Sequence, residues 1–186
     1  MSEVGTNVQQ AIDLMNSGSY ELAFFPAARA IEGTMEKVLG KLPSEIDYQN
    51  FFRENWQLIA FMGMPRALPL PMNIPFGIKR VLPSFNVHHG APEIILLVVI
   101  EALKFKRIPD AFVFNTTGQF EVKGGQVLLP VGLVCGLLGS VIFHPSNKDE
   151  VIGENYWINI SDFKMFVSEL FGRKDLVDRI MKFYEV

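Results

Sequence analysis

Cysteine and histidine, which often bind metals or act in catalysis, are scarce in this sequence. The chain of 186 residues holds one cysteine, Cys135, and three histidines. A single cysteine excludes an internal disulfide framework and a zinc site built from four thiolates. Residues 1–10 also lack the basic and then apolar order of a signal peptide. We therefore expect a protein of a reducing, cytoplasmic compartment.

A charge excess of one sign is missing as well. The 17 Lys and Arg residues stand against 20 Asp and Glu residues, for a formal net charge of −3. Proteins that coat duplex DNA normally carry a basic excess, so we expect no duplex DNA among the partners. With 49% hydrophobic residues and 16 phenylalanines, the chain can bury a core, and its length predicts a single domain over residues 1–186.

Apolar residues recur at helical spacing along most of the chain. Helices are predicted over about 7–17, 19–40, 48–61, 92–106, 130–143, 161–171 and 175–184. Short strands are predicted at 111–114, 120–122, 127–129 and 156–160. The pattern predicts an α+β fold that is mainly α. About six helices surround two buried apolar helices, at 92–106 and 130–143, and a small antiparallel sheet completes the domain.

The longest uncharged run, residues 127–143, has the length of a buried helix rather than of a membrane span. If Gly124-Gly125 turns a hairpin, the start of the run is a strand, and residues 130–143 form a helix about 21 Å long. A bilayer core needs roughly 30 Å, so we expect no membrane span. Gly132, Gly136 and Gly139 form a stripe of small residues, which predicts close contact with the helix at 92–106.

Residues 65–83 combine two properties that seldom occur together. Five prolines exclude a long helix or a central strand, yet most other residues of the segment are apolar. Such a segment should be extended and packed on the body of the protein. The candidate binding residues of the surface around 65–85 are Arg66, Phe76, Lys79, Arg80 and Phe85. We therefore expect first a non-enzymatic binding or regulatory protein, which contacts a protein partner or forms a homodimer through this apolar, proline-rich surface.

The reactive residues form no strong motif. His88 and His89 could bind zinc together with His144 and Cys135, but adjacent histidines in an extended chain point to opposite faces. Cys135 lies in an apolar run without a positive charge nearby, which favours a packed thiol over a nucleophile. A glycine-rich phosphate loop is absent. We expect neither a metal nor a cofactor.

The segment at about residues 7–40 resembles two known kinds of helical hairpin. Gly18-Ser19-Tyr20-Glu21-Leu22-Ala23, followed by Ala30, is similar to the middle of one tetratricopeptide repeat. The run from Tyr20 to Leu39 resembles the second helix of HEPN-type helical bundles, and Pro26 departs from both patterns.

The HEPN resemblance implies a metal-independent RNA-acting enzyme. Its catalytic residues would be Arg80 with His88 or His89, although seven residues separate Arg80 from His88, more than the family pattern has. Incubation with mixed RNA, with His88→Ala and His89→Ala compared, tests this alternative. The many Phe and Met side chains leave a further alternative, a carrier of a small apolar ligand, which native mass spectrometry would detect.

Overall fold

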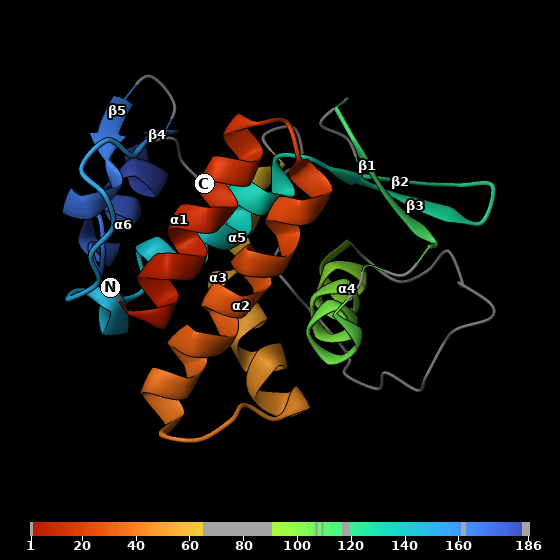
Figure 1. Cartoon of the computed structure of the whole chain (residues 1–186), viewed down its shortest axis with the longest axis horizontal. Helices are drawn as coiled ribbons and strands as arrows, with labels where there is room; N and C mark the ends of the chain where they lie inside the picture. Colours follow the sequence, from red (N-terminus) through yellow and green to blue (C-terminus); the bar gives the residue numbers. More distant parts are fainter. Residues whose placement is uncertain are drawn as a thin grey trace.

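Four helices form the centre of the structure. The computed structural model describes residues 2–64, 91–106, 108, 110–116, 120–160 and 163–183. Helices α1 (Glu3–Asn16), α2 (Tyr20–Leu39), α3 (Glu45–Gly63) and α5 (Leu133–Ile142) pack together in the middle. Helix α4 (Ala91–Phe105) lies on one side with strands β1–β3, and α6 (Lys174–Phe183) lies on the other with β4 and β5 (Figure 1). The predicted α+β fold, mainly α, is confirmed.

Capping residues set the ends of the central helices. Ser2 precedes α1, and its hydroxyl oxygen accepts the Gly5 N–H at 3.0 Å. Ser44 and Asp47 form a capping box at the start of α3, where the Ser44 N–H donates to the Asp47 carboxylate at 2.8 Å. Helix α2 ends at Gly40, whose φ of 66° favours glycine. These caps fix where α2 stops and α3 begins, and so define the turn between them.

The glycine stripe of α5 packs on α3. A Cβ at Gly136 would meet the Ile59 carbonyl oxygen, and one at Gly132 would meet the Gly63 carbonyl oxygen. The predicted contact of this stripe with the helix at 92–106 is therefore wrong. Gly63 supplies a second position without a side chain, so the α3 backbone can approach where a residue with a Cβ could not. Helix α4 instead packs against α2 and α3, while α5 occupies the centre.

The strands form two sheets rather than one antiparallel sheet. Strand β3 (Gln126–Pro130) lies between β2 (Glu121–Lys123), with which it pairs antiparallel, and β1 (Phe112–Asn115), with which it pairs parallel. Because β2 and β3 make the predicted tight hairpin, only the far edge of β3 is open to β1. Strands β4 (Trp157–Ile160) and β5 (Phe163–Phe166) form a separate antiparallel hairpin.

The helix predicted at 161–171 is wrong. Its described part is strand β5 followed by a 3-10 turn, η2 (Val167–Glu169). In β5, backbone groups pair with β4, and Met165 stands opposite Ile158. Cross-strand pairing gives the backbone groups of this short segment their hydrogen-bond partners. An isolated helix of the same length would gain little stability.

No helix among the described residues is long and apolar enough to cross a bilayer. The uncharged run at 127–143 is divided between β3 and α5, and α5 has only 10 residues.

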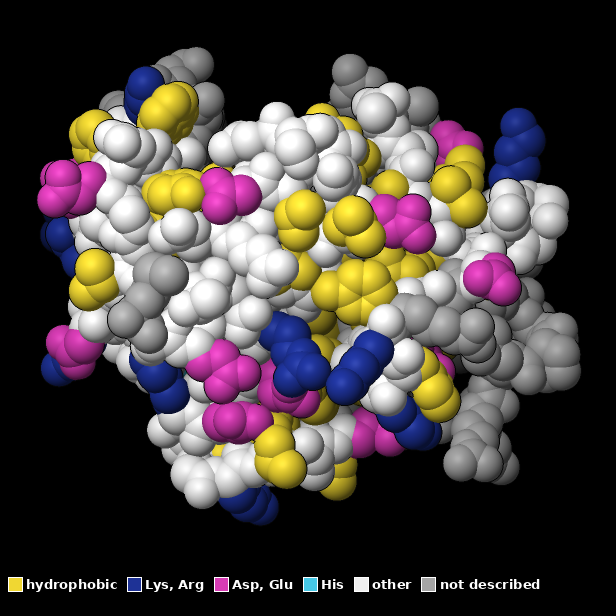
Figure 2. All heavy atoms as spheres, in the orientation of Figure 1, with side chains coloured by type: hydrophobic (Ala, Val, Ile, Leu, Met, Phe, Trp, Pro, Cys, Tyr) yellow, Lys and Arg dark blue, Asp and Glu magenta, His cyan; other side chains and the backbone are white. Residues whose placement is uncertain are grey.

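Charges of both signs are mixed among the described side chains of the face in Figure 2, where Lys and Arg stand between acidic and apolar groups. This face offers no continuous positive field, and the exclusion of duplex DNA stays a prediction.

Candidate functional site

The binding residues predicted from the sequence lie in one segment of the chain. Arg66, Phe76, Lys79, Arg80 and Phe85 all fall within 65–90, outside the described residues. His88 and His89, the candidate catalytic residues of the RNA-acting alternative, lie in the same segment. Both hypotheses stay predictions.

Two members of the possible zinc site, Cys135 and His144, are described. Cys135 lies on α5, where burial raises the pKa of its thiol, so the neutral, packed form is favoured at neutral pH. Within the described part of the chain, no three or more His, Cys, Asp or Glu side chains are grouped so as to hold a metal ion. His88 and His89 lie outside that part, so a site including them stays untested.

One face of α3 lines two adjoining hollows. The lining residues Asp47, Asn50, Phe51, Glu54 and Leu58 follow the i, i+3, i+4, i+7 and i+11 pattern, which places them along one side of the helix. Glu54 and His144 line both hollows, so the two hollows share a wall. We name the two hollows together the α3 groove.

The first hollow of the groove is mainly apolar and has a volume of about 170 Å³. It lies between the end of α2 and the first half of α3. Its lining residues are Met35, Val38, Leu39, Asp47, Asn50, Phe51, Glu54 and His144. Val38 and Leu39 are exposed, as are Leu42 in the α2–α3 turn and Ile46 at the start of α3. Exposed apolar side chains are therefore found both in the lining of the hollow and in the chain that joins α2 to α3.

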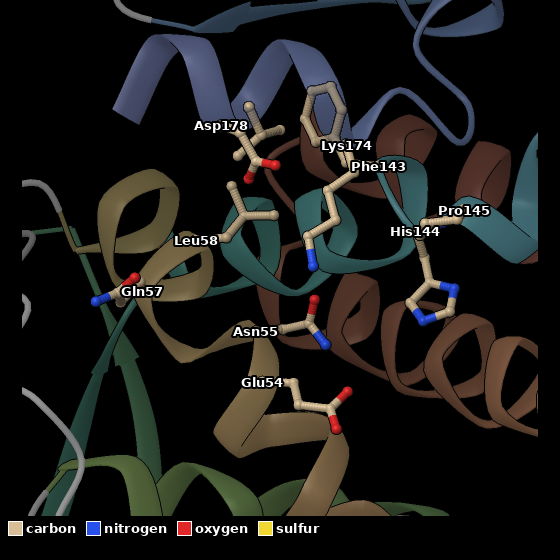
Figure 3. Close-up of a pocket in the computed structure, with 10 residues that line it drawn as sticks. Glu54, Asn55, Gln57, Leu58, Phe143, His144, Pro145, Lys174 and Asp178 are labelled. Carbon is tan, nitrogen blue, oxygen red and sulfur yellow. The ribbon is translucent and has the colours of Figure 1, made fainter. Parts of the chain in front are cut away.

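The second hollow is polar and has a volume of about 190 Å³. It lies between α3 and α6, beside the chain that leaves α5. Its lining residues are Glu54, Asn55, Gln57, Leu58, Phe143, His144, Pro145, Lys174, Val177 and Asp178. Figure 3 shows Lys174 extending from α6 toward Asn55, with the Glu54 carboxylate beyond it. The side chains of two helices from distant parts of the sequence therefore meet across this hollow.

His144 stands between the two hollows and is held in place from two sides. Its ring stacks on Phe51, with 5.8 Å between the ring centroids and 26° between the planes. The Ser146 N–H donates to Nδ1 at 3.3 Å, and the Ser146 Oγ lies 2.7 Å from the same nitrogen. Because Nδ1 accepts a backbone N–H, the proton of the neutral ring belongs on Nε2. The histidine therefore caps the turn that it begins, and the serine fixes its ring.

Burial is the main reason that the His144 ring stays neutral at neutral pH. Burial lowers the pKa of His144, the nearby Lys174 ammonium lowers it further, and the Glu54 carboxylate opposes them. Among the described residues, no carboxylate bonds the second ring nitrogen, so the serine–histidine pair lacks the third group of a hydrolytic triad. The groove thus presents a neutral imidazole between an acidic and a basic side chain.

Acidification should destabilise the folded protein through His144. Its pKa in the folded state lies below the usual value of about 6.5, so below that pH the unfolded chain binds the proton more strongly. The stability that the neutral ring contributes is complete above about pH 6.5 and is lost as the pH falls toward the folded pKa. His144→Asn keeps an acceptor for the Ser146 N–H and does not titrate.

The measurement is urea unfolding of both proteins at a series of pH values from about 7 to about 5. We expect wild type to lose more stability than His144→Asn over this range. His88 and His89 are present in both proteins, so their contributions cancel in the comparison. Parallel stability profiles for the two proteins would contradict the burial of a neutral His144.

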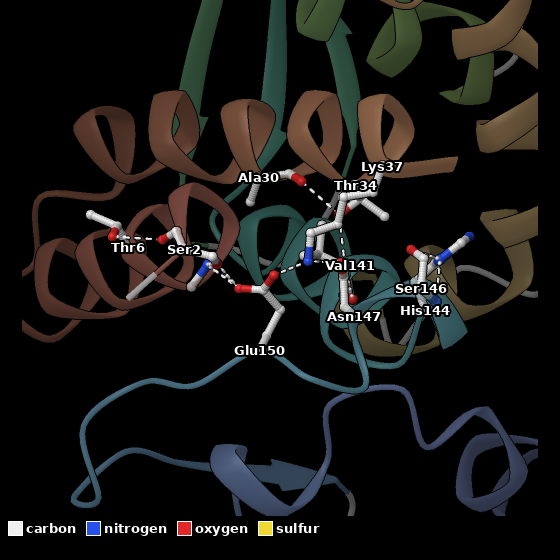
Figure 4. A network of polar contacts seen from close by, with 11 residues as sticks. Ser2, Thr6, Ala30, Thr34, Lys37, Val141, His144, Ser146, Asn147 and Glu150 are labelled. Atoms are coloured by element: carbon white, nitrogen blue, oxygen red, sulfur yellow. Dashed lines mark hydrogen bonds and ion pairs between the residues drawn. The ribbon is translucent and has the colours of Figure 1, made fainter. Parts of the chain in front are cut away.

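The chain after His144 is anchored to α1 and α2 by a buried polar network (Figure 4). The Asn147 amide donates to Thr34 Oγ1 and to the Val141 carbonyl oxygen, both at 2.8 Å. The buried Glu150 carboxylate accepts the Gly5 N–H at 2.8 Å, the Ser2 hydroxyl and the Lys37 ammonium. This network fixes the segment from 144 to 150, and with it one wall of the groove.

Comparisons with known proteins place this chain near a set of mycobacterial proteins. A family model described as Rv1289 matches residues 104–186. The chain is similar to uncharacterized protein Rv1289 of Mycobacterium tuberculosis strain H37Rv and to uncharacterized protein Mb1320 of Mycobacterium bovis. Each is 23% identical, over 92% of this chain and 84% of the relative. No solved structure matches the chain.

The family-model match covers the part of the groove that comes after α5. The matched region 104–186 contains His144 and the α6 residues, while α2 and α3 precede it. The alignments with the two relatives extend over most of the chain, so the relatives match more of it than the family model does. The names of these proteins state no function, so a function for the groove has to be inferred from its geometry.

Proposed function

We propose that this protein is a non-enzymatic binding protein, which holds a segment of a partner protein in the α3 groove. The observation that carries the proposal is the apolar hollow, in whose lining Val38 and Leu39 are exposed. Exposed apolar side chains that adjoin a hollow are typical of surfaces that bind partners. A groove along one helix face suits an extended or helical segment with an apolar anchor.

The expectations from the proline-rich segment remain part of this proposal. Residues around 65–85 would add a second contact surface, and the partner would be another protein rather than duplex DNA. Two other occupants are a second copy of this chain and a small apolar ligand. Native mass spectrometry of the purified protein distinguishes them from each other and from a different partner protein. A reducing, cytoplasmic compartment is supported by the lone Cys135, a free and half-buried thiol on α5.

Selection of a random peptide library on the immobilised protein tests the proposal. We expect the selected peptides to be enriched in large apolar residues, because the hollow is lined by Met35, Val38, Leu39 and Phe51. Val38→Gln should weaken the binding of a selected peptide about tenfold, since a polar group replaces an apolar contact worth about 1–2 kcal/mol. Fluorescence anisotropy of the labelled peptide measures the change.

Leu22→Gln is the matched control for Val38→Gln. Both residues lie on α2 and are exposed to the same degree, 57% for Leu22 and 58% for Val38. The two positions are about 24 Å apart along the helix, so only Val38 reaches the groove. Equal weakening by both variants, or selected peptides without apolar enrichment, would refute the proposal.

A further inference from the structure

Among the described residues, the charged side chains that line the apolar hollow are all acidic. Asp47 and Glu54 are its charged lining residues, and none of the described Lys or Arg residues lines it. His144 adds no positive charge at neutral pH, because burial lowers its pKa. The hollow therefore combines an apolar interior with a negative edge.

The two carboxylates differ in whether they already have hydrogen-bond or ion-pair partners among the described residues. Asp47 accepts the hydroxyl of Ser44 at 2.6 Å and its N–H at 2.8 Å. These bonds lower the pKa of Asp47, and the nearby Lys41 also lowers it. Within the described chain, no Lys or Arg nitrogen lies within ion-pair distance of Glu54. Glu54 is thus the carboxylate whose charge is available to a partner.

The basic groups near the apolar hollow are not part of its lining, although Lys41 lies close enough to Asp47 to lower its pKa. Arg53 lies on the exposed side of α3, and its guanidinium donates to the Asn50 amide oxygen at 3.0 Å. Lys174 lines only the polar hollow, where it extends toward Asn55 (Figure 3). A cation that enters beside Glu54 from the apolar side consequently meets a carboxylate before it meets Lys174.

We infer that the segment bound in the α3 groove carries a Lys or Arg next to its apolar anchor, with the cationic head against Glu54. This inference rests on the proposed function and names the chemistry of its partner. The apolar anchor fills the hollow formed by α2 and α3, and the basic side chain crosses its negative edge. Long basic side chains suit this arrangement, because their apolar stems can lie along the hollow while the charge stays at the edge.

The test repeats the library selection on wild type, Glu54→Gln and Glu45→Gln. Wild type should enrich Lys and Arg as well as apolar residues, and Glu54→Gln should lose only the basic enrichment. Glu45 lies on α3 and is exposed, but it lines neither hollow, so Glu45→Gln should behave as wild type. Glu54→Lys should shift the selection toward Asp and Glu.

The affinity of one selected basic peptide gives a second readout. Glu54→Gln should weaken it about two- to fivefold, the range of an exposed ion pair, and should reduce its dependence on salt. Apolar enrichment without basic enrichment on wild type would overturn this inference and leave the proposed function standing. Peptides without apolar enrichment would instead overturn the proposed function itself.

Discussion

Replacing Glu150 with alanine is expected to lower the free energy of unfolding by about 2–4 kcal/mol. The Glu150 side chain is 1% exposed and accepts hydrogen bonds from Gly5, Ser2 and Lys37. It therefore joins the N-terminus of α1 and the last turn of α2 to the segment that carries His144. Its negative charge also lies at the positive end of the α1 dipole.

The loss of stability is limited because the groups that contact Glu150 can find other partners after the substitution. The Lys37 side chain is 35% exposed, so water can take over part of the solvation of its ammonium group. The Gly5 N–H keeps the Ser2 hydroxyl as an acceptor at 3.0 Å. The remaining cost is the loss of charge-assisted hydrogen bonds in a buried site, and of the link between three parts of the chain.

Urea unfolding of Glu150→Ala and of the control Glu154→Ala measures the effect. Glu154 is exposed and follows four residues later, so its replacement should change stability by less than about 0.5 kcal/mol. Because the network fixes the wall that carries His144, Glu150→Ala should also weaken peptide binding to the groove. Equal stabilities of the two variants would show that the network contributes nothing.

Most helices can be predicted because their signals are local. Gly40 ends α2, as expected, and apolar residues at helical spacing mark α3 and α4. The predicted start of α3, at residue 48, is three residues late. The signal for the true start is present in the sequence, since Ser44 and Asp47 have the spacing of a capping box. Strand β5 also carries a signal, because polar Lys164 stands between apolar neighbours.

The α3 groove could not be predicted, because it depends on which helices lie side by side. Its walls come from the consecutive helices α2 and α3 and from α6 and the chain after α5, which lie much later in the sequence. Val38 looks like an ordinary core residue when read at helical spacing, yet it is exposed. His144 has no motif around it, and only its stacking on Phe51 reveals its place between the hollows. These features depend on how the helices pack, and the amino-acid composition carries no information about that packing.

The packing of α5 on α3 leads to the second large prediction. Gly136→Ala should lower the free energy of unfolding by about 1–3 kcal/mol or more. An added Cβ would meet the Ile59 carbonyl oxygen, and the Gly63 Cα would lie 3.2 Å away. Both are backbone atoms of α3, so the clash is relieved only if the two helices move apart. That movement would loosen the buried contacts along α5 and displace the His144 wall of the groove.

Gly139→Ala is the control that separates this clash from general effects of glycine replacement. Gly139 lies on the same helix and is also buried, but an added Cβ there would meet the side chain of Met62. Met62 is flexible and can turn aside, and alanine gains about 1 kcal/mol of helix propensity over glycine at both positions. We therefore expect Gly139→Ala to be near neutral in thermal or urea unfolding. If Gly136→Ala were as stable as Gly139→Ala, the backbones of α3 and α5 could not be in close contact, and the groove built on α3 would need a different wall.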